Sequence, residues 1–139
     1  MRKVMFNKSE NGSLFLNNKT QSIRLKRSIR FDNIEQRLVA IKMYNEEFDV
    51  IYLTEMDIHN PENWKAFESF VQNNKEIIKE SKDVSMFLNN KTQAVRIPAS
   101  MAFPAHSKEA TIEEYFVANS EQDLSTSSQK ILKLIVARG

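Results

Sequence analysis

The chain has 139 residues, of which 41% are apolar and 27% charged, so it can bury a core as one domain or two small ones. It has no cysteine and only two glycines, which excludes disulfide scaffolds, thiol nucleophiles, thiolate metal sites and glycine-rich nucleotide-binding loops. No apolar run is long enough to span a bilayer and the N-terminus lacks a secretory pattern, so we expect a cytoplasmic protein with no membrane partner.

The net charge of +2 is unevenly distributed along the chain. Residues 1–53 carry ten basic residues against six acids, residues 54–84 carry four against seven, and residues 85–139 carry six against five. The stretches 13–30 and 85–103 contain basic residues and no acid at all. This pattern favours contact with an anionic partner through two separate stretches.

An internal repeat defines the organisation of the chain. The nine residues 13–21, SLFLNNKTQ, recur at 85–93 as SMFLNNKTQ, with eight of nine identical at an offset of 72. The likeness continues from 22–25 to 94–97, and it ends on the pairs Ser28/Ser100 and Phe31/Phe103. We therefore interpret the chain as two copies of one unit.

Each copy has the pattern of paired strands. In the first copy, short strands at 14–16 and 22–25 flank Asn17-Asn18, a pair that tolerates the positive φ of a tight hairpin turn. Alternating stretches at 37–43 and 48–53 predict a second hairpin, with counterparts at 110–117 and 130–136 in the second copy. Pro98 predicts a short helix or turn after the second copy's first hairpin, and we expect residues 118–129 to form a mobile loop.

A helix is expected between the two copies. Asn60 has the character of an N-cap, Pro61 suits the first helical position, and Glu62 suits the first turn. Apolar residues then recur at helical spacing up to Ile78, which predicts an amphipathic helix to about Lys82 that Asn73-Asn74 can interrupt. The resulting division is a first unit at 1–54, a helical connecting segment at 55–84 and a second unit at 85–139.

The repeated stretch resembles a known signature. FLNNKTQAVRIP at 87–98, and less fully its first copy, is similar to the opening motif of VapB/VagC-type antitoxins, which have an AbrB/SpoVT-like swapped-hairpin domain. This resemblance implies a mainly β fold with short helices, in which two AbrB-like units form an intramolecular pseudo-dimeric barrel joined by the amphipathic helix. We expect a monomer of this kind, with a homodimer that exchanges units as the rival arrangement.

The resemblance also implies two partners, operator double-stranded DNA and a PIN-domain (VapC-like) ribonuclease toxin. For the first hairpin, the expected DNA-binding residues are Asn17, Asn18, Lys19, Thr20, Gln21, Arg24, Lys26 and Arg27. For the second hairpin they are Asn89, Asn90, Lys91, Thr92, Gln93 and Arg96. The expected toxin-binding residues are Trp64, Lys65, Phe67, Phe70 and Val71.

Each assignment has an alternative. The Asn-rich turns can be purely structural, and an aromatic stripe more commonly packs on its own protein. The expected function is an antitoxin that represses its own operon, and the alternative is a stand-alone AbrB-like transcriptional regulator. His59 and His106 have no accompanying cluster, so we expect no enzyme activity, no metal and no cofactor.

Overall fold

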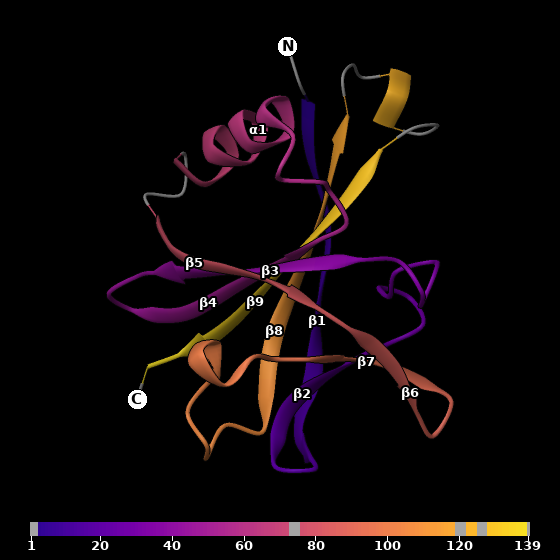
Figure 1. The fold of residues 1–139 in the computed structure, drawn as a ribbon, viewed down its shortest axis with the longest axis vertical. Helices are drawn as coiled ribbons and strands as arrows, with labels where there is room; N and C mark the ends of the chain where they lie inside the picture. Colours follow the sequence, from indigo (N-terminus) through magenta and orange to yellow (C-terminus); the bar gives the residue numbers. More distant parts are fainter. Residues whose placement is uncertain (1–2, 73–75, 119–121, 125–127, 139) are drawn as a thin grey trace.

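The computed structural model describes residues 3–72, 76–118, 122–124 and 128–138. These residues form one antiparallel sheet of nine strands and a single α-helix (Figure 1). The strands are β1 (Lys3–Asn17), β2 (Thr20–Leu25), β3 (Leu38–Tyr44), β4 (Phe48–Thr54), β5 (Ile77–Val84), β6 (Met86–Asn89), β7 (Thr92–Arg96), β8 (Glu109–Ala118) and β9 (Gln129–Ala137). The helix α1 spans Pro61–Gln72, and two 3₁₀ turns, η1 and η2, span Ala99–Met101 and Gln122–Leu124.

The sheet is curled, and its edges belong to one continuous stretch of chain. Its strand order is β5-β3-β4-β9-β8-β1-β2-β7-β6. The outermost strands β5 and β6 follow each other along the chain with only Ser85 between them. The predicted mainly β fold class is confirmed, and the curled sheet has the shape of a half-barrel.

The two copies exchange strands within this sheet. Residues 3–13 of β1, which precede the first hairpin, pair with β8 of the second copy. β5, which precedes the second hairpin, pairs in the same antiparallel way with β3 of the first copy. The copies also meet directly, β2 against β7 and β4 against β9. Ile23 lies opposite Val95, its own counterpart at offset 72, so the β2–β7 pairing has an approximate two-fold axis at this residue pair.

Several expected elements are confirmed and two need correction. The strand pairs at 38–54 and 109–137 lie where the sequence predicts them, and the Asn60 side chain caps α1 by accepting a hydrogen bond from the Glu62 amide at 2.9 Å. The helix does not continue to Lys82, however: it ends at Gln72, and residues 77–84 form β5. The alternation of exposed and half-buried residues along β5 has the two-residue period of a strand, and pairing with β3 decides its conformation.

The expected break at Asn73-Asn74 lies outside the described residues. The same holds for half of the loop expected at 118–129, namely residues 119–121 and 125–127. Among the described residues, no helix is long and apolar enough to cross a membrane.

Strands β3 and β4 are buried on both faces, whereas buried and half-buried residues alternate along much of β8 and β9. Alternate residues such as Leu38 and Ala40 point into the curled interior, which also holds Ile23, Val95 and the loop residues Phe31 and Phe103. The intervening residues form a second cluster on the outer face, and α1 covers that cluster. Burial on both faces explains why β3 and β4 have nearly continuous apolar sequences.

Candidate nucleic-acid interface

The repeated nine-residue stretches form two hairpins whose tight turns have unusual backbone conformations. Asn18 and Lys19 have φ values of 51° and 68°, and Asn90 and Lys91 repeat these values. Two successive positive φ angles define a type I′ turn, which matches the twist of the strands on either side. The turn pairs are therefore Asn18-Lys19 and Asn90-Lys91, one residue later than the sequence suggests, and Asn17 ends β1.

These hairpins lie side by side and form a four-stranded layer made of residues 14–17 of β1 with β2, β7 and β6, which we call the hairpin layer. Its inner face carries Ile23 and Val95 into the core, and its outer face carries the residues that alternate with them. The outer face includes Phe15, Ser22 and Arg24 from the first hairpin and Phe87, Ala94 and Arg96 from the second.

Two arginines have their guanidinium groups over phenylalanine rings on this outer face. The guanidinium carbon of Arg24 lies 4.6 Å from the ring centroid of Phe15, and that of Arg96 lies 5.0 Å from the centroid of Phe87. The two rings pack edge to face, with centroids 6.5 Å apart. Arg24 also donates a 2.7 Å hydrogen bond to the side-chain oxygen of Asn89, which links the two hairpins. A stacked guanidinium keeps its N–H edge available for phosphate or a base, so this arrangement orients both arginines for an anionic ligand.

The charge of the hairpin layer has one sign. Lys19 and Lys91 are exposed at the turns, Arg96 is exposed, Arg24 is half-buried, and Lys26 and Arg27 are exposed just after β2. Residues 11–31 and 84–108 contain no acidic residue. The layer therefore presents six cations with two aromatic rings between them, a combination suited to a polyanion.

The two glutamines of the repeated stretch have a different role. The side-chain amide of Gln93 is buried and binds both backbone groups of Phe31, accepting from its N–H at 3.0 Å and donating to its carbonyl at 2.9 Å. Gln21 makes the corresponding pair of bonds to Phe103, at 2.8 and 3.3 Å. Each glutamine thus holds the loop of the other copy and directs its amide away from the outer face.

The residues expected to bind a toxin lie far from this layer. Figure 1 shows α1 at one end of the molecule and both hairpin turns toward the other. The side chains of Phe67, Phe70 and Val71 lie on the face of α1 that is buried against the sheet. The rings of Phe67 and Phe70 each pack edge to face on the ring of Tyr52, with centroids 5.5 Å apart. Trp64 is half-buried at the margin of this cluster and Lys65 is exposed. The docked helix therefore leaves only Trp64 and Lys65 of the five accessible to a partner.

The sequence interpretation did not include Phe15 and Phe87 among the site residues. The sequence offered one indication of them, because both lie inside the repeated nine residues. In the structure both side chains are half-buried. Among the described residues, no group of three or more His, Asp or Glu side chains is arranged to hold a metal ion.

Comparisons with known proteins return no relative. No protein-family model matches this chain, and no curated protein or solved structure matches it.

Proposed function

We propose that this protein binds duplex DNA through the outer face of the hairpin layer and acts as an AbrB-like transcriptional regulator. The observation that carries the proposal is the pair of arginines stacked on Phe15 and Phe87 in a layer without acidic residues. The exchanged pairing of β1 with β8 and of β5 with β3 supports the resemblance to swapped-hairpin proteins. An approximate two-fold axis in the layer suits a DNA site with two related halves.

A role for these residues in stability alone is the competing explanation. Tight hairpins need the Asn18 and Asn90 conformations, but they do not need an exposed lysine at the next position or a stacked arginine beyond it. A purely structural layer also has no reason to exclude acids over more than twenty residues in both copies. DNA binding accounts for both features.

The test measures binding to a 30-base-pair duplex by fluorescence anisotropy over a range of salt concentrations. With about six phosphate contacts, the logarithm of the affinity should fall with the logarithm of salt concentration at a slope of about −5. The combined change of Lys19, Arg24, Lys91 and Arg96 to Ala should reduce the slope to about −2 and remove most of the affinity. Lys65→Ala with Lys79→Ala removes exposed charge from α1 and β5 and is the control, since it should leave the slope unchanged. An unchanged slope in the fourfold variant would refute DNA binding by this face.

A toxin-neutralising role is the second candidate, and the position of α1 is the observation that favours it. Because α1 lies at the end opposite the hairpin turns, a protein on its exposed side would leave the DNA-binding face free (Figure 1). Binding would then use Trp64 and Lys65, since use of Phe67 and Phe70 requires α1 to leave the sheet. Co-expression with a PIN-domain ribonuclease tests this role: Trp64→Ala should abolish rescue of growth, and rescue by that variant would exclude binding through Trp64.

A further inference from the structure

The two ends of the hairpin layer differ in charge although the layer is nearly symmetric. Because β2 and β7 are antiparallel, the chain leaves β2 at the end where β7 begins, next to the turn of the second hairpin. Figure 1 shows the chain turning after β2 toward the side where the β6–β7 turn lies. We call this end the second-turn end, and the end at the Asn18-Lys19 turn the first-turn end.

Counting the cations at each end shows the difference. The second-turn end has Lys91 in its turn, Arg24 in the adjoining part of β2, and Lys26 and Arg27 directly after β2. At the first-turn end, the offset of 72 places Lys19 and Arg96 at the positions of Lys91 and Arg24. The counterparts of Lys26 and Arg27 there are Pro98 and Ala99, which are uncharged. The second-turn end thus has four cations, beside which Glu10 accepts a hydrogen bond from Ser28, and the first-turn end has two, beside which the Glu80–Lys82 ion pair binds Ser100. With these groups included, the second-turn end still has the larger net positive charge.

Arg24, near the second-turn end, is also held by more contacts than Arg96, near the first-turn end. Arg24 is fixed both by the Phe15 ring and by its 2.7 Å bond to Asn89. Arg96 is more exposed and lies over the Phe87 ring. The cation nearer the second-turn end therefore loses less side-chain entropy when it binds a phosphate.

We infer that the hairpin layer binds DNA with a fixed polarity, in which the second-turn end grips the phosphate backbone more strongly than the first-turn end. This inference rests on the proposed DNA-binding function. Its physical basis is that each phosphate neutralised by Lys or Arg releases counterions, so an end with four cations holds the backbone against salt better than an end with two. The partner is a duplex whose two half-sites are held unequally.

The absence of cysteine in the sequence makes a direct test available. Thr20 and Thr92 are equivalent residues, both half-buried, at the start of the strand that follows each turn. Thr20→Cys and Thr92→Cys, each labelled with a photoactivatable azidophenacyl group, place the same probe at the two ends. The labelled proteins are mixed with a 30-base-pair duplex and irradiated at increasing salt concentration.

We expect the probe at position 92 to cross-link several-fold more DNA than the probe at position 20, and the ratio to grow as salt rises. A variant that moves two charges, with Lys26→Ala and Arg27→Ala combined with Ala99→Arg and Ala102→Lys, has the same net charge and should reverse the ratio. Ala99 and Ala102 are both exposed, so the added side chains extend into solvent.

The outcomes separate this inference from the proposed function. Equal cross-linking from both positions at all salt concentrations, or a ratio that the charge-moving variant leaves unchanged, would overturn the polarity while leaving DNA binding intact. No cross-linking from either position, together with no change in anisotropy of the duplex, would overturn the proposed function itself.

Discussion

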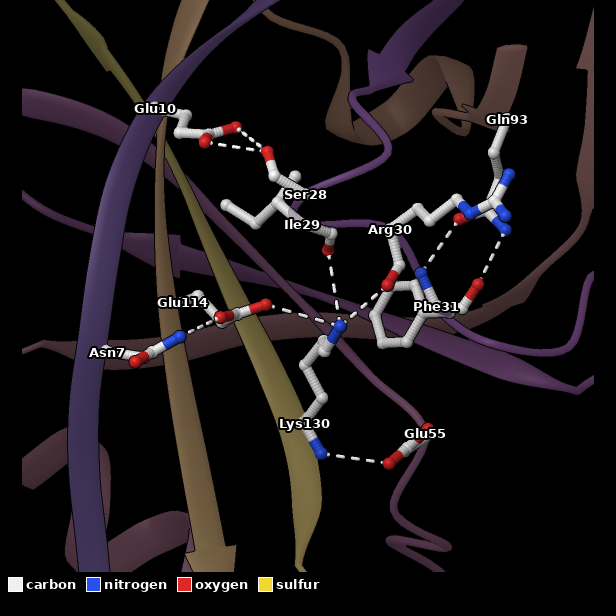
Figure 2. Close-up of polar contacts among 10 residues, drawn as sticks. All are labelled: Asn7, Glu10, Ser28, Ile29, Arg30, Phe31, Glu55, Gln93, Glu114 and Lys130. Atoms are coloured by element: carbon white, nitrogen blue, oxygen red, sulfur yellow. Dashed lines mark hydrogen bonds and ion pairs between the residues drawn. The ribbon is translucent and has the colours of Figure 1, made fainter. Parts of the chain in front are cut away.

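Besides the shared apolar core, polar residues join the two copies on both sides of the approximate two-fold axis. Figure 2 shows Gln93 bound to the backbone of Phe31, and Lys130 below it donating to the carbonyl oxygens of Ile29 and Arg30 at 3.4 and 2.6 Å. Lys130 also forms an ion pair with the buried Glu114 at 3.2 Å. The loop after β2 is thereby fixed by two residues of the second copy.

The first copy has a related ion pair with its charges reversed. Lys42, which occupies the position of Glu114 at offset 72, pairs with Asp49 at 3.7 Å and lies 5.1 Å from the ring centroid of Phe103. Burial lowers the pKa of Lys42, and the neighbouring Asp49 opposes that shift. The two copies therefore have equivalent backbones but opposite charges at these buried positions. This difference favours pairing of a first copy with a second copy over pairing of two identical copies.

Replacement of Gln93 tests the role of these residues. Gln93→Ala leaves the backbone N–H and carbonyl of Phe31 without their partner in a buried position, so we expect a loss of about 2–4 kcal/mol in the free energy of unfolding. Urea denaturation followed by circular dichroism measures it. Gln21→Ala is the matched variant, and it should cost less because Gln21 is only half-buried and one of its bonds is 3.3 Å long. If Gln93→Ala has wild-type stability and a weaker affinity for DNA, the glutamine is a DNA contact instead.

At the scale of elements, α1 shows how the surroundings of a helix decide the role of its apolar stripe. The outer face of β3, β4, β8 and β9 is itself apolar, with Tyr52 at its centre, and it needs a cover. The helix provides one through Phe67, Phe70 and Val71. Beyond the helix, the buried Glu76 accepts a 2.6 Å hydrogen bond from Lys133 and a 3.3 Å hydrogen bond from the hydroxyl of Tyr52.

Truncation of the helix stripe should therefore destabilise the whole protein. We expect Phe67→Ala to lower the free energy of unfolding by about 3–5 kcal/mol, because it removes a fully buried ring and leaves a cavity. Lys65→Ala, on the exposed side of the same helix, should change it by less than about 0.5 kcal/mol. Thermal and urea denaturation compare the two variants. A Phe67→Ala protein as stable as the Lys65→Ala protein would mean that α1 does not stay docked in solution.

At the scale of the whole molecule, neither copy contains a complete sheet. Three of the strand pairings, β1–β8, β2–β7 and β4–β9, join one copy to the other, and β3–β5 joins the first copy to the segment that directly precedes the second. A single copy would keep only its own hairpins, and isolated hairpins are marginally stable in water. Covalent linkage gives the two copies a high effective concentration for each other.

We therefore expect the full chain to sediment as a folded monomer at micromolar concentration. A chain that ends at Gln72 loses β5 to β9 and should either unfold or associate into a dimer of first copies. Sedimentation velocity combined with circular dichroism distinguishes these states. A monomeric, cooperatively folded product from the shortened chain would show that the copies are independent domains.

The sequence by itself determined the local structure of the hairpins and the start of the helix. The Asn-rich turns, the closing hairpins and the Asn60 cap depend on residues close together in the chain, so local preferences reveal them. The repeat at an offset of 72 follows directly from the identical residues of the two stretches. The basic, acid-free stretches were visible for the same reason. The position of the turn was predicted to within one residue.

Only the tertiary structure decided the rest, because pairing between distant segments overrode local pattern. β5 has the sequence pattern of a helix end, and pairing with β3 makes it a strand. The first half of β1 has its apolar residues Val4, Met5 and Phe6 in one run without alternation, and pairing with β8 makes it a strand. Gln21 and Gln93 belong to the same motif as Lys19 and Lys91, yet alternation along the strand turns the glutamines inward onto the other copy's loop. The stacking of Arg24 and Arg96 and the unequal charge of the two ends likewise follow from the antiparallel pairing of β2 with β7, which no local pattern specifies.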